Sequence, residues 1–72
     1  MKKIKKIKIR VNGKIKSINK DFKLSELINL LKIPLKKVAI ELNEEIIDKK
    51  KINKIKLNKS DKIEIVHFIG GG

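Results

Sequence analysis

The chain has 72 residues and no cysteine, so it holds one small domain without a disulfide, a cysteine-ligated metal site or a thiol nucleophile. It carries 20 Lys and Arg against 8 Asp and Glu, a formal net charge of +12. No apolar run reaches the roughly 20 residues of a membrane span, and none follows the basic start as in a signal peptide, so we expect a cytoplasmic protein.

The positive charge raises nucleic acid as a partner, yet Arg10 is the single arginine and aromatic residues make up 3% of the chain. Guanidinium groups grip bases and phosphates most specifically, and single-strand binders rely on aromatic stacking. Lysine is spread through every segment together with Ile and Asn, as in an AT-rich coding sequence. We therefore expect the positive charge to reflect compositional drift. Binding to an acidic partner surface is the second explanation, and binding to nucleic acid is the third.

Apolar and charged residues alternate over residues 5–11, which predicts a strand with one buried face. That face would carry Ile7, Ile9 and Val11. Asn12-Gly13 supplies the two positive-φ residues of a type I′ turn. Residues 15–18 continue as a second strand, in which Ile15 and Ile18 share a face only through a bulge, so its register stays open. Residues 17–21 would form the exit loop.

Four apolar residues at helical spacing predict a core-facing helix over residues 24–32. They are Leu24, Leu27, Ile28 and Leu31. Its start is poorly marked, because Lys23 stands where a capping side chain is useful and Asp21 or Ser25 would have to substitute. Pro34 disfavours helical geometry at Ile33 and helps to end the helix.

Alternation predicts a third strand over residues 38–42, a turn at residues 43–45 and a short fourth strand at Ile46-Ile47. Lys49-Lys50-Lys51 reads as a solvated charge run. A helical turn anchored by Ile52 and Ile55 is expected next to it.

A polar turn at residues 58–61 leads into a last strand over residues 62–68. Ile63 and Ile65 occupy one face of this strand, and Val66 and Phe68 occupy the other. The single helix covers one face of a sheet, so the other face is a candidate interface. We predict an α+β fold with one helix packed across a mixed sheet of four to five strands, with the last strand central and parallel to the first.

The sequence closes on three glycines, Gly70, Gly71 and Gly72. Glycine adopts backbone angles closed to other residues and passes through narrow channels. Four extended residues from Ile69 would reach about 13 Å, enough to enter a partner's active site. A terminal carboxylate can attack the α-phosphate of ATP to give an acyl adenylate; the simpler alternative is a frayed end.

ATP would have to be bound by another protein, because the chain has no phosphate-binding Gly-x-x-x-x-Gly-Lys loop and no cluster of metal ligands. His67 is the one histidine, and sequence spacing pairs no Ser or Asp with it. We expect it to be a surface or interface residue. The sequence thus predicts a protein co-substrate without catalytic side chains or a bound cofactor.

Three runs of residues resemble the ThiS family of sulfur carriers in thiamine biosynthesis. They are Leu-Ser-Glu-Leu-Ile-Asn-Leu-Leu at 24–31, Val-Ala-Ile-Glu-Leu-Asn-Glu-Glu-Ile-Ile at 38–47 and Ile-Glu-Ile-Val-His-Phe-Ile-Gly-Gly-Gly at 63–72. The Val-His-Phe-Ile motif before the glycines is the most specific part. The sequence departs from the family at Ser60, where many members have glycine, at Lys23, which replaces a usual Thr cap, and in its high charge.

The resemblance implies a β-grasp domain over residues 1–68 and a flexible glycine tail over residues 69–72. It implies that Gly72 is adenylated by a ThiF-like adenylyltransferase, which uses ATP and Mg, and is converted to a thiocarboxylate that passes sulfur to a ThiG-like thiazole synthase. Gly71 and Gly72 match the family's diglycine. The partner interface would comprise four residues near the tail, which are Val66, His67, Phe68 and Ile69. The protein alone is expected to be a monomer.

Other functions remain open at this point. A carrier for molybdopterin, similar to MoaD, or for tRNA thiolation would share the fold, the activation and the tail. A ubiquitin-like protein modifier would instead place Gly72 on lysines of other proteins. A small basic RNA-binding module would not need the glycines at all.

Overall fold

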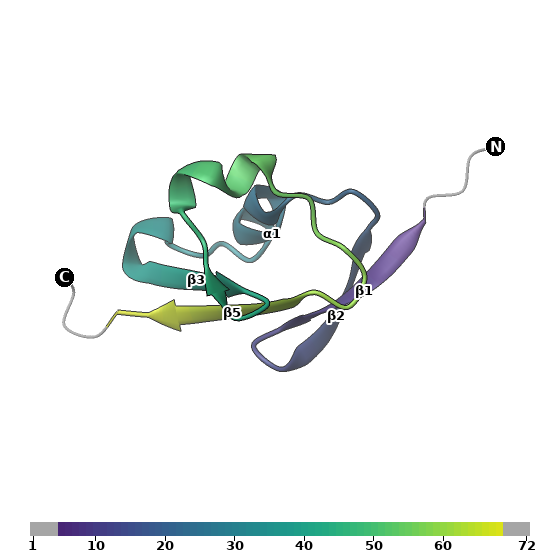
Figure 1. Cartoon of the computed structure of the whole chain (residues 1–72), viewed down its shortest axis with the longest axis horizontal. Helices are drawn as coiled ribbons and strands as arrows, with labels where there is room; N and C mark the ends of the chain where they lie inside the picture. The colour runs from purple at the N-terminus through teal and green to yellow at the C-terminus, as the bar shows by residue number, and fades with distance from the viewer. Residues whose placement is uncertain (1–4, 69–72) are drawn as a thin grey trace.

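The structure, a computed structural model, describes residues 5–68 (Figure 1). Strands and short helices alternate along this part of the chain. In order, they are β1 (Lys6–Val11), β2 (Lys14–Asn19), α1 (Leu24–Leu30), the 3₁₀ turn η1 (Leu35–Lys37), β3 (Val38–Leu42), β4 (Glu45–Ile46), the 3₁₀ helix η2 (Lys49–Lys54) and β5 (Lys62–His67). The expected Ile46-Ile47 strand therefore begins and ends one residue earlier, because Asn43 and Glu44 make a two-residue turn with φ of 51° and 71°.

The five strands form one mixed sheet in the order β2-β1-β5-β3-β4. β5 pairs in parallel with β1 and antiparallel with β3, so the last strand lies in the middle of the sheet. α1 and η2 lie together on one side of the sheet (Figure 1). The predicted α+β arrangement, with one main helix and a central last strand, is confirmed.

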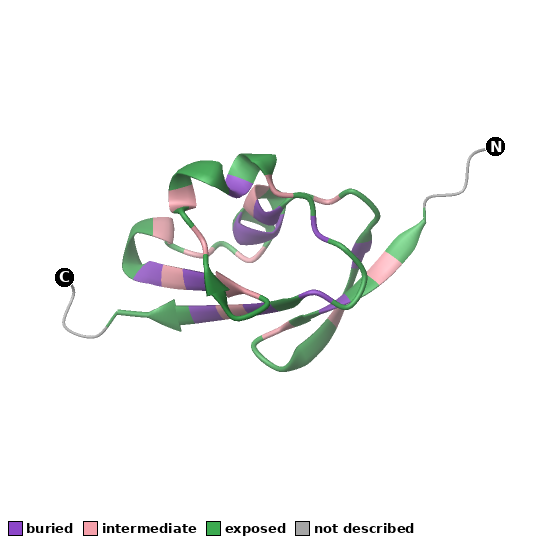
Figure 2. Ribbon diagram, in the orientation of Figure 1, coloured by how far each residue is buried: buried purple, intermediate pink, exposed green. Residues whose placement is uncertain are grey.

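Buried apolar residues of the sheet, of α1 and of η2 form a single core. Buried positions are the purple segments of the ribbon in Figure 2. The buried members are Ile9, Ile18, Leu24, Leu27, Ile28, Val38, Ile40, Ile52, Leu57, Ile63 and Ile65. Residues on β3 and β5 alternate between this core and the opposite surface, as the pleat of a strand requires. We call the helix-covered side of the sheet its inner face and the opposite side its outer face.

The first hairpin turns at Asn12 and Gly13, whose φ values of 49° and 82° confirm the two positive-φ positions. Its register is regular, with Ile7 opposite Ile18 and Arg10 opposite Ile15, so no bulge is needed. Ile15 and Ile18 lie on opposite faces of β2, and only Ile18 is buried. The exit loop predicted at residues 17–21 is wrong for its first three residues, because the core holds Ile18 and the strand continues to Asn19.

Helix α1 ends at Leu30, two residues before the predicted boundary. Lys32 adopts φ 54°, and its N–H donates to the Asn29 carbonyl at 3.1 Å. The Ile33 N–H donates to the Ile28 carbonyl at 3.1 Å, which completes a Schellman termination. This local motif ends the helix before Ile33 and Pro34 are reached.

The start of α1 uses neither of the substitutes expected from the sequence. Lys23 is the N-cap residue, and its N–H donates to the Glu26 carboxylate at 3.0 Å. An ammonium group carries no acceptor, so the reciprocal bond of a capping box, from the Glu26 N–H to the capping side chain, cannot form. The helix therefore begins with half of a capping box.

Candidate functional site

The site predicted from the sequence lies where β5 leaves the sheet. Val66 is opposite Ala39, and His67 is opposite Val38. Val66 and Phe68 expose 51% and 49% of their surface, and His67 is exposed between them. The expectation that Val66 and Phe68 point away from the core is confirmed. Ile69, Gly70, Gly71 and Gly72 lie outside the described residues, so their roles stay predictions.

Phe68 is held in place just beyond the end of β5. Its N–H donates to the Lys37 carbonyl at 2.9 Å, which extends the pairing of β5 toward η1. The Lys49 ammonium lies 5.1 Å from the centre of the Phe68 ring, a cation–π distance. The chain therefore enters residues 69–72 from a fixed position.

A side-chain amide extends the parallel pairing of β1 with β5. β1 pairs with β5 only at Arg10 and Val11, after which the hairpin turns away. The Asn12 Oδ1 accepts the Ile65 N–H at 2.7 Å, and its Nδ2 donates to the Ile65 carbonyl at 3.4 Å. Asn12 thus takes the place of a further strand residue beside Ile65, two residues before the end of β5. The sequence predicted Asn12 only as a turn residue. Its hydrogen bonds to Ile65 could not be predicted in the same way, because the two residues are 53 positions apart in the chain.

The start of β5 is fixed by a second polar cluster. The buried Asp61 carboxylate accepts the Asn43 amide at 3.0 Å and the Asn58 N–H at 2.7 Å. The Asn43 Oδ1 in turn accepts the Lys62 N–H at 2.9 Å. Ser60, in the turn between them, has φ 70°, a conformation that glycine adopts without strain. That backbone angle explains why glycine would suit this position.

The outer face of the sheet carries more apolar surface than the sequence predicted. Ile15 and Ile46 are exposed at 62% and 78%. Each shares the face of Val66, because Ile15 is opposite Arg10 across β1 and β2, and Ile46 is opposite Glu41 across β3 and β4. The two-residue turn fixes the register of the hairpin, so the face on which Ile15 lies could have been predicted from the Asn12-Gly13 motif. Ile46 was predicted only as a strand residue.

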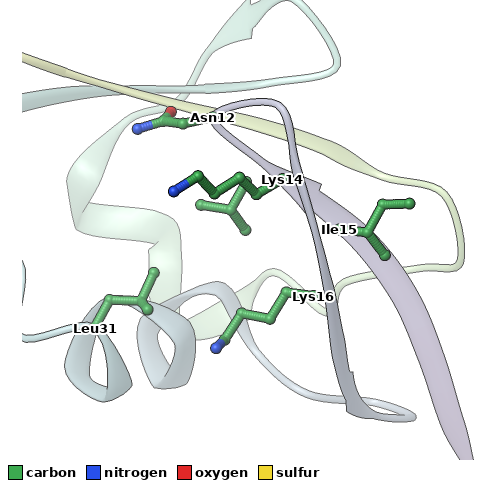
Figure 3. Close-up of a pocket in the computed structure, with 6 residues that line it drawn as sticks. Asn12, Lys14, Ile15, Lys16 and Leu31 are labelled. Carbon is green, nitrogen blue, oxygen red and sulfur yellow. The ribbon is translucent and has the colours of Figure 1, made fainter.

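A hollow of about 400 Å³ lies between the first hairpin and the end of α1 (Figure 3). Its lining consists of Val11, Asn12, Lys14, Ile15, Lys16 and Leu31. The Ile15 side chain points away from those of Lys16 and Leu31 (Figure 3). The other lining side chains offer ammonium groups, an amide and apolar surface, and none of them is a carboxylate or histidine that could pair with a nucleophile. The lining does not build a catalytic centre.

The described part of the chain has neither a metal-ligand cluster nor a membrane-spanning helix. Within residues 5–68, no three His, Cys, Asp or Glu side chains gather closely enough to hold a metal ion. Among the same residues, no helix is long and apolar enough to cross a membrane.

Known proteins resemble both the sequence and the fold. The sequence model of the ThiS family matches residues 9–72. The sulfur carrier protein ThiS of Bacillus subtilis is 38% identical over 65 residues, which are 89% of this chain and 98% of the relative. The crystal structure of the thiamine biosynthesis protein ThiS from Geobacter metallireducens superimposes with a TM-score of 0.80 at 28% identity, covering 92% of this chain and all of that one.

A thiazole synthase of Paramagnetospirillum magneticum is also similar, with 36% identity over 66 residues. The match covers 92% of this chain but only 20% of that protein, so the chain spans about a fifth of the length of this relative. The architecture is the β-grasp fold expected from the resemblance. Because the family match extends from β1 through β5 and the fold agrees with it, the chain belongs to the ThiS family.

Proposed function

We propose that this protein is a sulfur carrier for thiamine biosynthesis, with the carboxyl group of Gly72 as the atom group that carries sulfur. The observation that carries the proposal is the family match over residues 9–72, which includes the glycines. The exposed end of β5 supports it, since Phe68 is anchored four residues before Gly72. Such a terminus can reach about 13 Å into an enzyme while the domain remains outside.

The chemistry needs two displacements. The Gly72 carboxylate attacks the α-phosphate of ATP, pyrophosphate leaves, and an acyl adenylate forms. A hydrosulfide-equivalent nucleophile then attacks the carbonyl carbon and AMP leaves, so one carboxyl oxygen departs with AMP and sulfur takes its place. ATP and Mg belong to a partner adenylyltransferase of the ThiF type, where the metal ion offsets phosphate charge. The carrier itself supplies the acyl group and acts as a co-substrate rather than an enzyme.

Thiazole synthase is the proposed recipient of the sulfur. Thiazole synthases of Paramagnetospirillum magneticum and Magnetococcus marinus match this chain over about a fifth of their own length. A carrier-like segment joined to that enzyme would have a high effective concentration at its active site. Separate chains would need a binding surface instead, and Val66, His67, Phe68 and Ile69 are the residues we propose for it, together with Ile46 on the outer face.

The test is the intact mass of the protein after incubation with ATP, magnesium, a sulfide source and the cognate activating enzyme. We expect a gain equal to exchanging one oxygen for one sulfur. The control lacks Gly71 and Gly72 and should show no gain, although its circular dichroism should match that of the intact chain. An unchanged mass of the intact chain, with an enzyme active on another carrier, would contradict the proposal.

A further inference from the structure

Four residues from two separate 3₁₀ segments line an open surface pocket near the end of β5. η1 contributes Leu35 and Lys36, and η2 contributes Lys49 and Lys50. The pocket has a volume of about 530 Å³. Leu35 is half-buried against the core, so the floor is apolar and fixed. We call Lys36, Lys49 and Lys50 the tail-root lysines.

The tail-root lysines adjoin the end of β5. Lys49 lies over the Phe68 ring at 5.1 Å, and Phe68 donates its N–H to Lys37, the residue after Lys36. Two independent contacts therefore tie the lysine pocket to the last described residue. A protein that binds this pocket also contacts the chain where residues 69–72 begin.

The tail-root lysines form a basic patch beside the end of β5. All three side chains line the same pocket in a chain of net charge +12, so they add positive potential at one place on the surface. The neighbouring Asp48 carboxylate accepts the Lys50 N–H at 3.0 Å as the cap of η2. An acidic surface of a partner is complementary to this patch.

We propose that the tail-root lysines dock an acidic surface of the activating adenylyltransferase, with Asp or Glu side chains of that enzyme placed over the apolar floor at Leu35. The inference rests on the proposed function and adds the chemistry of the partner surface. Carboxylate side chains fit the pocket because they combine a short apolar stem with a negative head. A nucleic-acid strand fits less well, since Lys49 already covers the nearby Phe68 ring and the pocket has no arginine.

The test compares two triple variants that each lower the net charge by three. The first is Lys36→Gln, Lys49→Gln and Lys50→Gln. The matched control is Lys6→Gln, Lys20→Gln and Lys59→Gln, three exposed positions at the start of β1, after β2 and before β5, away from the tail. The readout is ATP-dependent pyrophosphate release by the cognate enzyme, measured as KM and kcat over a series of salt concentrations.

For the tail-root variant we expect KM to rise about tenfold at low salt, with a weaker dependence of KM on salt and a kcat within about twofold of the unaltered chain. The control should change KM by less than about threefold. Lys49→Arg alone should keep the unaltered KM, because it retains the charge.

Three results would overturn the inference. Equal effects of the two triple variants would assign the change to net charge alone, and an unchanged KM would remove the lysines from the interface. Binding of an RNA oligonucleotide through these lysines, without competition between the RNA and the enzyme, would assign them to nucleic acid. In each case the unaltered chain is still adenylated, so the proposed function is not contradicted. Only the absence of adenylation of the unaltered chain would contradict both the docking inference and the proposed function.

Discussion

Asn12 performs two structural tasks with one residue. Its backbone adopts φ 49° in the hairpin turn. Its side-chain amide forms hydrogen bonds with both the N–H and the carbonyl of Ile65. Asparagine tolerates the left-handed region better than most residues, so the turn and the contact with β5 are compatible. The amide therefore fixes the strand next to the proposed interface residues.

We predict that Asn12→Gly lowers the free energy of unfolding by about 1–2 kcal/mol, because glycine keeps the positive φ but removes the bonds to Ile65. Asn12→Asp retains the acceptor for the 2.7 Å bond from the Ile65 N–H and should lose less. Urea denaturation of the unaltered chain and the two variants measures the order of their free energies of unfolding. A glycine variant as stable as the unaltered chain would show that water replaces the amide without loss.

Elements with a strong hydrophobic period were predictable, and their ends were less so. Spacing placed Leu24, Leu27 and Ile28 on the buried side of α1, and alternation placed Ile63 and Ile65 in the core. These patterns follow directly from the geometry of helices and strands. The sequence therefore predicted both elements and their buried faces.

Positions that depend on partners distant in sequence were not predictable in this way. The Lys37–Phe68 hydrogen bond joins residues separated by most of the second half of the chain, and the Lys49–Phe68 contact joins the start of η2 to the residue after β5. The end of α1 depended on a left-handed Lys32, a conformation for which lysine gives no signal. The lysine pocket was therefore invisible in the sequence, where Lys49-Lys50-Lys51 read as a solvated loop.

The incomplete capping box of α1 yields a second prediction. Lys23→Ser adds a hydroxyl that can accept the Glu26 N–H, while Glu26 already accepts the N–H of residue 23. We expect the free energy of unfolding to rise by about 1 kcal/mol. Lys23→Ala is the matched control and should stay within about 0.5 kcal/mol of the unaltered chain, since neither side chain caps the helix. Equal thermal denaturation curves for the Ser and Ala variants would contradict the assignment.

At the scale of the whole molecule, the two sides of the sheet have different tasks. The inner face is covered by α1 and η2 and supplies the core. The outer face has no covering element among residues 5–68 and exposes Ile15, Ile46 and Val66. Exposed apolar residues gathered on one face mark interaction sites more often than isolated ones do. Leu30 is a useful contrast, because it is exposed at 56% but lies on α1, in the other layer.

We therefore predict that Ile46→Ser combined with Val66→Ser weakens activation and leaves the domain folded. Both side chains are at least half exposed, so the free energy of unfolding should change by no more than about 1 kcal/mol. Loss of two apolar contacts at a partner interface should raise the KM for adenylation at least ~10-fold. The matched control, Leu30→Ser, removes similar exposed apolar surface from the helix layer and should leave KM unchanged. Comparable KM values for the unaltered chain, the double variant and Leu30→Ser would show that the outer face does not contact the enzyme. The strand end and the tail-root lysines would then be the remaining candidate contacts.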